Sequence, residues 1–452
     1  MLIDLARGGA FRPAPLHLNP TLFRSCTHGR LFRNAAIAVL VISCTAPGAQ
    51  ALGAVVSGRI ASVRDETASA KRRVGDDAQR EYELGSAYRM GQGVTRDLPA
   101  AIRHYRESAD HGYAPAQNAL GDMYATAEGV RQDFVEAARW YAKAAAQSLP
   151  EAEHSLGFLC ERGLGVARSP AQAAHWYRRA ADQGFAPAQN NIGLLYKKGL
   201  GVPQDDVAAV GWFRQAADQG LAAGEDNLGL MLASGHGAPT DLGEAAKWFR
   251  RAADQGHTPG ELNLAALYRT GDGVRQDPEE ALRWFRRAAD QGDAEAQNNV
   301  GMMYATGEGA PQNNDLAMEW YRKAAQQGYP GAQYNIGLCY QNGSGAPADD
   351  AMAALWYGRA AGQGYAPAQL NLGILYATGR GVTKDVVLAY MWFTLASAKV
   401  EPGQEEIGAR AIQDRNLAAA GMSPAQINDA ESRAGRWKPK VASQPPAFTA
   451  DR

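Results

Sequence analysis

The chain repeats a pattern of 36 residues nine times in succession, with no insertion or deletion between residues 78 and 399. A tryptophan recurs at this period from Trp140 to Trp392. A fixed period of this length is typical of stacked supersecondary units that share one extended core. The period therefore excludes a single globular core and favours a binding function. The same place in each unit also holds a small residue, hereafter the recurrent glycine: Gly85, Gly121, Gly157, Gly193, Gly229, Ala265, Gly301, Gly337 and Gly373.

Each unit predicts two helices joined by a glycine-rich turn. In residues 151–185, Ala152 and Leu156 lie four residues apart on one face of a first helix. Ala173 and Trp176 begin a wider apolar stripe on a second helix. The Gly-x-Gly turn between them permits a positive φ at the end of the first helix. Each repeat is therefore expected to be a helical hairpin.

Small residues in both helices predict close packing. The second helix carries alanine at one position in all nine repeats, from Ala101 to Ala389. A glycine inside a helix costs up to about 1 kcal/mol relative to alanine, so a bulky neighbour must need the space at the recurrent glycine. We expect the tryptophan of the second helix to be that neighbour. The second helix is expected to open with an Asp in capping-box spacing to Glu, as at Asp133, Asp241 and Asp277.

Two polar rows accompany the apolar pattern. Arginine and lysine recur late in the second helix, as at Arg250 and Arg251, and predict a solvated outer face. An asparagine recurs two residues before the recurrent glycine, and its side-chain amides form a ladder along the repeats. These amides could clamp a bound peptide, but we expect them to hydrogen-bond the neighbouring repeat or its turn. The ladder comprises Asn191, Asn227, Asn263, Asn299, Asn335 and Asn371.

The motifs Ala-x-x-x-Leu-Gly-x-x-Tyr, Gly-x-Gly-Val, Asp-x-x-x-Ala-x-x-Trp-Tyr and Ala-Ala-x-x-Gly resemble the Sel-one-like repeat (SLR) family, a branch of the tetratricopeptide-like repeats. The resemblance covers about 320 of 452 residues. It implies an all-α fold, a right-handed α-solenoid of nine helix-turn-helix repeats over residues 78–399 with a helical cap over 400–436. It also implies an adaptor that binds a protein or peptide on its concave face, often in the bacterial envelope.

By analogy with tetratricopeptide geometry, the partner surface is the side of the first helix turned away from the second. It corresponds to positions −3, +1 and +4 from the recurrent glycine. An apolar row beside polar residues suits a peptide or a partner helix, and ordinary packing between repeats is the equally weighted alternative. The candidates at −3 are Tyr82, His154, Asn190, Asp226, Asn298, Tyr334 and Leu370, and those at +1 are Phe158, Leu194, Leu230, Met302, Leu338 and Ile374.

Residues 1–51 have the pattern of a secretory signal peptide. Basic residues precede an apolar run at 35–42, and an Ala-x-Ala site ends at Ala51. The run is too short to cross a bilayer. We expect export to the periplasm, with lipoprotein processing at Cys44 and full secretion as alternatives. Residues 52–77 predict a linker, and residues 437–452 a disordered tail.

The remaining composition excludes several functions. Lys and Arg number 46 against 47 Asp and Glu, a net charge of −1 that gives no basis for a nucleic-acid partner. Cys160 and Cys339 are five repeats apart and predict no disulfide, and the histidines form no metal motif. His104, at the tryptophan position of the first repeat, is interpreted as an edge substitution. We expect no enzymatic activity, no cofactor and no metal ion. One alternative is a hydrolase of cell-wall peptide or β-lactam, which needs a nucleophile and a base in one pocket. The other is a secreted factor that binds a host protein.

Overall fold

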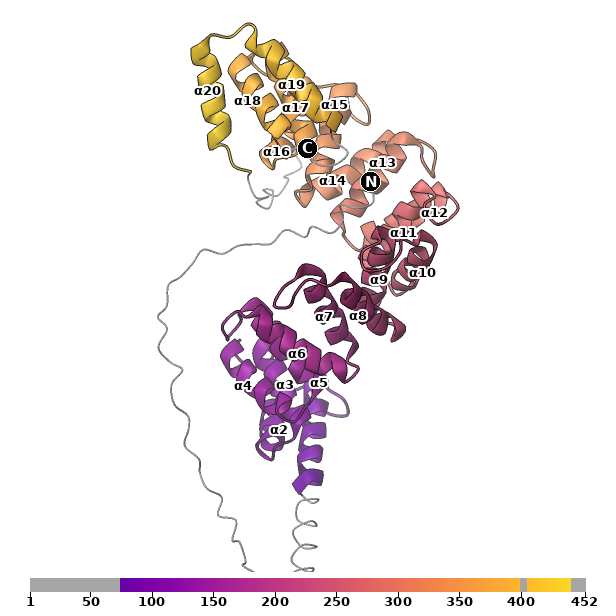
Figure 1. Cartoon of the computed structure of the whole chain (residues 1–452), viewed down its shortest axis with the longest axis vertical. Helices are drawn as coiled ribbons and strands as arrows, with labels where there is room; N and C mark the ends of the chain where they lie inside the picture. The colour runs from indigo at the N-terminus through magenta and orange to yellow at the C-terminus, as the bar shows by residue number, and fades with distance from the viewer. Residues whose placement is uncertain (1–73, 399–404, 440–452) are drawn as a thin grey trace, which may run out of the picture. The chain divides into compact units, whose positions relative to one another are not determined.

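The computed structural model describes residues 74–398 and 405–439, which are helical or in turns throughout (Figure 1). The predicted signal peptide, Cys44 and residues 440–452 lie outside the described residues. Residues 74–90 form the first helix, which thus includes the last residues assigned to the linker. The later helices are α2 (Leu98–Asp110), α3 (Ala114–Thr126), α4 (Phe134–Ala145), α5 (Pro150–Arg162), α6 (Pro170–Asp182), α7 (Ala186–Lys198), α8 (Asp206–Asp218), α9 (Ala222–Ser234), α10 (Leu242–Asp254), α11 (Thr258–Thr270), α12 (Pro278–Asp290), α13 (Ala294–Thr306), α14 (Asn314–Gln326), α15 (Pro330–Asn342), α16 (Asp350–Gly362), α17 (Ala366–Thr378), α18 (Val386–Ala398), α19 (Glu405–Ala419) and α20 (Pro424–Arg436).

The helices belong to two compact units. The N-terminal unit holds the described residues up to Ala152 with Leu164–Val166, and the C-terminal unit holds Glu153–Gly163 and the chain from Ala167 onward. Within a repeat the two helices pack together, as α3 does with α4 and α7 with α8. The second helix then packs on the first helix of the next repeat, as α8 does on α9 and α10 on α11. The predicted all-α solenoid of tandem helical hairpins is therefore confirmed.

Glycine is needed in the turn for two separate reasons. In the fourth repeat, Gly199 ends α7 with φ 63° and Gly201 follows with φ 75°, both in the left-handed region. A Cβ on Gly201 would also lie 2.2 Å from the carbonyl carbon and oxygen of Pro170, at the start of α6 in the preceding repeat. The second glycine therefore holds the turn directly against the backbone of its neighbour.

The second helices begin with the predicted side-chain caps. The Asp133 carboxylate accepts hydrogen bonds from the backbone N–H groups of Val135 and Glu136 at 2.9 and 3.0 Å. Asp241 and Asp277 cap α10 and α12 in the same way. The glutamates of the expected boxes pair instead with basic residues three positions on, as Glu136 does with Arg139. The capping half of the prediction is confirmed, and a reciprocal box forms at the start of α20.

Tryptophan was expected to be the bulky neighbour of the recurrent glycine. The glycine instead makes room for the Tyr or Phe that follows the tryptophan in the second helix. A Cβ on Gly193 would lie 2.7 Å from Cε1 of Phe213, and one on Gly121 would lie 2.5 Å from Cε1 of Tyr141. Successive helical residues point about 100° apart, so the tryptophan faces a different neighbour. Its ring is covered by a basic side chain three residues on, as Arg251 covers Trp248 at 4.5 Å. The expectation for tryptophan was therefore wrong by one residue.

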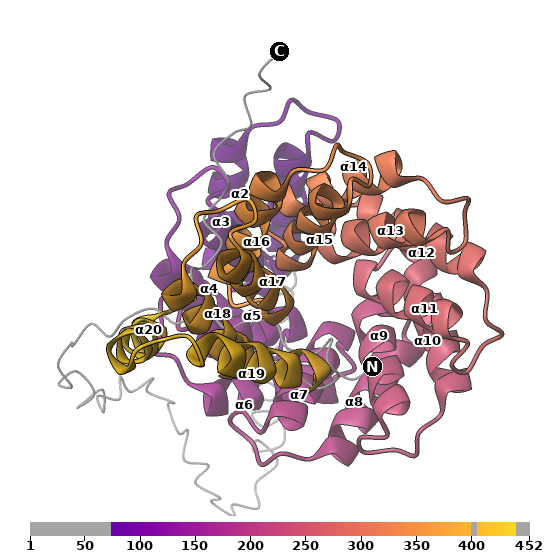
Figure 2. The same ribbon diagram turned by 90° about the horizontal axis from the view of Figure 1, so that it is seen from above.

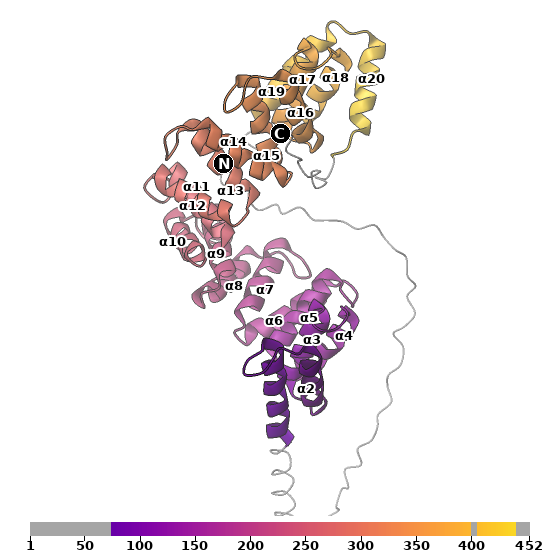
Figure 3. The same cartoon turned by 180° about the vertical axis from the view of Figure 1, so that it is seen from behind.

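The C-terminal cap covers the last repeat. Helix α19 packs on α17 and α18, and α20 packs on α18 (Figure 3). Trp437, just after α20, contacts Trp392 with ring centroids 6.3 Å apart and planes at 74°. Leu395 occupies the place of the basic side chain that covers tryptophan in several other repeats. The two helices predicted in this region are thus confirmed, and they close the apolar end of the array.

Candidate partner-binding surface

The first helices form the inner side of the repeats in the C-terminal unit. Helix α9 lies inside α10, and α13 lies inside α14, in Figure 2, and α9 contacts both α7 and α11. The side chains at −3, +1 and +4 from the recurrent glycine belong to these inner helices. The predicted binding row therefore belongs to the inner helices of this unit.

The −3 positions serve mainly to hold repeats together. Asn190, Asp226, Asn298 and Leu370 are buried, so the expectation that they lie on an open surface is wrong for these four. The remaining −3 candidates are half-buried and pack on aromatic rings: Tyr82 on Tyr105 and Tyr113, His154 on Tyr177 and Phe185, and Tyr334 on Tyr357 and Tyr365.

The asparagine ladder explains the burial of these polar side chains. Asn227 donates its Nδ2 hydrogen bond to Oδ1 of Asn190 at 2.9 Å, and Asn263 donates to Oδ1 of Asp226 at 2.8 Å. Asn191 likewise contacts His154, and Asn335 donates to Asn298. Each bond joins a −2 amide to the −3 side chain of the preceding repeat. The expectation that the ladder bonds neighbouring repeats is therefore confirmed at these four junctions.

Burial shifts the pKa of two groups in this ladder. It raises the pKa of the Asp226 carboxyl, although the hydrogen bond from Asn263 and the charges of His257 and Lys197 oppose the shift. It lowers the pKa of the His154 imidazole, which is packed between Tyr177 and Phe185. Both shifts favour the neutral side chain, as expected for groups whose role is packing.

The +1 positions differ, because their apolar side chains are not fully covered. Phe158 on α5 is 41 % exposed, with the Arg162 guanidinium 5.7 Å from its ring centroid. The other five candidates at +1 are partly exposed on α7, α9, α13, α15 and α17, and α11 carries Ala266 at this position. The +1 row therefore remains the candidate partner-binding surface, and it comprises Phe158, Leu194, Leu230, Met302, Leu338 and Ile374.

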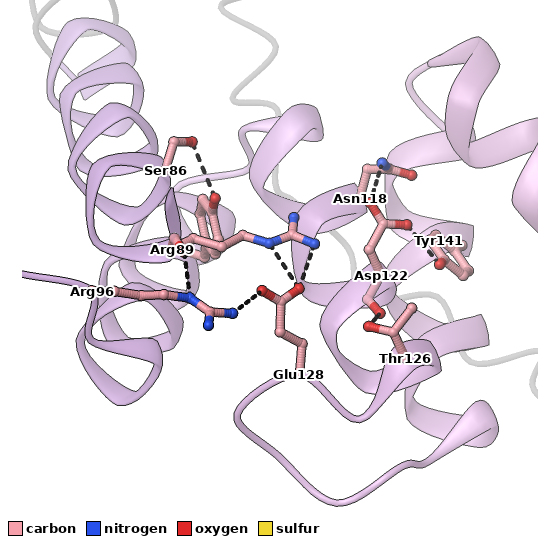
Figure 4. Close-up of polar contacts among 9 residues, drawn as sticks. Ser86, Arg89, Arg96, Asn118, Asp122, Thr126, Glu128 and Tyr141 are labelled. Carbon is pink, nitrogen blue, oxygen red and sulfur yellow. Dashed lines mark hydrogen bonds and ion pairs between the residues drawn. The ribbon is translucent and has the colours of Figure 1, made fainter. Parts of the chain in front are cut away.

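In the N-terminal unit, the corresponding surface is polar and internally paired. Asp122 at +1 accepts a hydrogen bond from the Tyr141 hydroxyl at 2.8 Å, and burial raises the pKa of its carboxyl (Figure 4). The guanidinium groups of Arg89 and Arg96 both point to Glu128, at 2.6 and 3.4 Å. This pairing lowers the pKa of Glu128. The apolar row is thus a property of the C-terminal unit.

Hydrogen bonds from the tyrosine over the recurrent glycine to the residue at +4 were missed from the sequence. Tyr177 donates its hydroxyl hydrogen bond to Glu161 at 2.8 Å, and Tyr357 donates to Gln341 at 2.5 Å. The available signal was a tyrosine sixteen residues after a polar side chain at +4.

The basic side chains late in the second helices were expected to form a solvated outer face. They also bond groups of the repeat stack. Arg251 pairs with the buried carboxylate of Glu225 at 2.8 Å while it covers a tryptophan, and Arg250 donates to the Tyr268 hydroxyl at 2.6 Å. The residue four before the recurrent glycine is Glu or Gln in every repeat. Burial raises the pKa of the Glu225 carboxyl against the opposing charge of Arg251. In the fifth repeat, these two arginines therefore pair with groups of the repeat stack instead of only facing solvent.

Two further features of the described residues are the buried cysteines and the hollows at the turns. Cys160 and Cys339 are buried and unpaired, in agreement with the expected lack of a disulfide, and burial raises the pKa of Cys339 to about 11. Hollows at the turns of the first two repeats are lined by the caps Asp97 and Asp133. Neither hollow contains Ser, Cys or His in its lining. No helix in the described ranges has the length and apolarity needed to cross a membrane.

Comparison with known proteins places this repeat among described families. The model of the Sel1 repeat matches residues 81–113, 114–149, 150–185, 186–221, 222–257, 258–293, 294–329, 330–365 and 366–399. The crystal structure of a Sel1 repeat protein from Oxalobacter formigenes is similar at 33% identity over 69% of this chain and 91% of that one, with a TM-score of 0.53. The protective antigen c5321 of uropathogenic Escherichia coli, which displays an SLR fold, is 30% identical over 86% of this chain and 99% of that chain, with a TM-score of 0.45. No curated protein matches the chain.

Proposed function

Because this chain belongs to the Sel1 repeat family, whose members are generally protein-interaction scaffolds, we propose that its C-terminal unit binds a helix of a partner protein on the +1 row. The observation that carries the proposal is the incomplete burial of apolar side chains at +1 on six first helices of this unit, α5, α7, α9, α13, α15 and α17. The fold of this family is typically a non-enzymatic scaffold, and the proposed function requires no chemistry.

The flanking residues favour an amphipathic helix as the occupant. On the −3 side of the +1 row, the polar groups are largely engaged in bonds between repeats. On the +4 side lie polar side chains in four of the repeats, namely Glu161, Lys197, Arg269 and Gln341. A helix with one apolar stripe would cover the +1 row and keep its charged edges beside these groups. Burial of the Lys197 ammonium lowers its pKa, as expected for a charge close to an apolar surface.

Charge substitution on the row tests this proposal. A photo-crosslinking residue at Leu230 would first identify the partner, and its affinity would then be measured by calorimetry for the wild type and for Leu230→Glu. Introducing a charge into an apolar contact should weaken binding by about tenfold or more. Val207 is 69 % exposed at the start of α8, so Val207→Glu is a matched control on a second helix. Unchanged affinity in a folded Leu230→Glu variant would refute the proposal.

We also propose that the chain is exported before it binds its partner. The support is the basic segment, the apolar run at 35–42 and the Ala-x-Ala site ending at Ala51. Cell fractionation and N-terminal sequencing of the mature protein test the proposal, with cleavage after Ala51 as the expected result. A mature chain that begins with an acylated Cys44 would instead establish the lipoprotein alternative, and an uncleaved cytoplasmic chain would refute export.

A further inference from the structure

The first repeat departs from the others at one position that has a chemical consequence. His104 on α2 occupies the position of the recurrent tryptophan. Its Nδ1 lies 2.6 Å from Oε2 of Glu81, on the helix of residues 74–90. Glu107 completes the group, and the ligand atoms of the three side chains all lie within 4.8 Å of one another. Two carboxylates and an imidazole therefore converge from two helices.

The fold preorganises this group. His104 and Glu107 are three residues apart on α2, so they lie next to each other on one helix face. The ring of Tyr88 stacks on the imidazole with centroids 5.3 Å apart and an angle of 3° between the planes. Glu81 and His104 keep about a quarter of their side-chain surface exposed, and Glu107 is exposed. The group is thus held in place on one side and open to solvent on the other.

Within the described ranges, neither carboxylate forms an ion pair with a lysine or arginine: the ion pair of Glu81 is with His104, and no ion pair involves Glu107. Two neighbouring arginines contact other groups, since Arg80 pairs with Asp77 and Arg106 donates to the Tyr124 hydroxyl. Arg103 is exposed on α2, four residues before Glu107.

We propose that Glu81, His104 and Glu107 bind a divalent transition-metal ion, with Zn²⁺ as the reference ion. One imidazole nitrogen and two carboxylate oxygens are a suitable ligand set for zinc, at about 2.0 to 2.2 Å from the ion. Ligand atoms at tetrahedral angles then lie about 3.3 Å apart. Nδ1 of His104 and Oε2 of Glu81 are 2.6 Å apart in this structure, so they must move apart when the ion replaces the hydrogen bond. The exposed Glu107 side chain can complete the set by a change of rotamer. Water completes the coordination. The ion would join the first helix to α2 and so stabilise the N-terminal repeat.

The other repeats supply substitutions that should remove the metal site and keep the fold. Glu81→Gln installs the residue found at this position in five repeats, as at Gln117, and His104→Trp installs the residue found in the other eight, as at Trp140. His236→Gln is the control, because this exposed histidine lies in the turn after α9. Circular dichroism at 222 nm would establish that each variant is folded. If Glu81→Gln or His104→Trp is not folded, Glu107→Gln replaces it, because Glu107 lies at an exposed position.

The experiment is a calorimetric titration of the full chain, purified without a polyhistidine tag and treated with a chelator, with Zn²⁺, Mn²⁺ and Mg²⁺ in turn. We expect one zinc ion per chain at this site with a dissociation constant of roughly 10 μM, weaker than in closed four-ligand sites. Glu81→Gln and His104→Trp should each weaken this binding at least tenfold, and His236→Gln should not change it. Hydrogen exchange in residues 74–90 should slow when zinc is added. Failure of zinc to bind, or equal binding by wild type and the folded variants, would overturn the proposal.

Discussion

The contact between the recurrent glycine and the aromatic ring leads to a quantitative test in the fourth repeat. A methyl group added in Gly193→Ala would lie 2.7 Å from Cε1 and 2.9 Å from Cδ1 of Phe213. These distances are about 1 Å shorter than favourable carbon–carbon contacts, and overpacking of this kind costs about 1–3 kcal/mol. Alanine recovers up to about 1 kcal/mol of helix propensity. We therefore expect Gly193→Ala to lower the free energy of unfolding by up to about 2 kcal/mol.

The same repeat contains a matched control. Gly211 also lies inside a helix, but a Cβ there would meet no atom within 4 Å. Gly211→Ala should therefore raise the free energy of unfolding by up to about 1 kcal/mol. Because the propensity term is common to both variants, their difference isolates the contact with the ring at about 1–3 kcal/mol. Urea titration followed by circular dichroism at 222 nm measures both values.

Two results would refute this reasoning. The first is an equal change in stability for Gly193→Ala and Gly211→Ala. The second comes from a double-mutant cycle, in which Phe213→Leu should reduce the cost of Gly193→Ala and Trp212→Leu should not. Relief by Trp212→Leu would restore tryptophan as the bulky neighbour. The sixth repeat shows that the junction can adapt, since Ala265 is fully buried there, so costs near the lower end of the range are expected.

Further predictions concern pH, the cap and local stability. Burial raises the pKa of Glu261, so its ionisation should reduce wild-type stability as pH rises from about 4.3. Urea titrations at pH 4 and pH 7 should therefore show the stability of Glu261→Gln relative to wild type increasing with pH, and a constant difference would contradict this. A chain that ends at Gly364 lacks α17–α20, so it should expose apolar surface on α16 and aggregate. Light scattering and urea titration test this, and a soluble product that unfolds cooperatively would contradict it. Gly358 and Gly362 weaken α16, so its amides should exchange faster than those of α14, and equal protection would reject this prediction.

The period predicted the helices and turns well because their residues are chosen by local conformation. Gly199 needs a left-handed backbone, and Ser423 caps α20 as its spacing with Pro424 indicated. These requirements are the same whatever the helix packs against. The prediction of the tryptophan as the glycine's neighbour failed because a contact between helices depends on rotation about the helix axis. The pattern placed Trp212 and Phe213 on one stripe and did not distinguish them.

For a related reason, the sequence predicted the helix side of the candidate binding surface but not which of its positions are covered. Offsets from the recurrent glycine identified the inner side of each first helix, but the curvature of the stack decides which offset is covered by the next repeat. Asn190 and Leu194 were therefore equivalent candidates in the sequence. The structure separates them, because Asn190 is buried and accepts the bond from Asn227, whereas Leu194 is partly exposed. The group around His104 escaped notice because Glu81 comes from another helix, 23 residues earlier.

The contact between each turn and the backbone of the preceding repeat has a consequence for evolution. At Gly201 the turn meets Pro170, and the corresponding glycines Gly237 and Gly381 meet Asp206 and Asp350 in the same way. Since this contact uses main-chain atoms, it does not depend on which side chains the preceding unit carries. Unequal crossing-over in the gene could then add or delete whole units and keep this contact. A shift of a single codon within a turn would break the register at once, so selection is expected to change the length of such arrays in complete 36-residue steps.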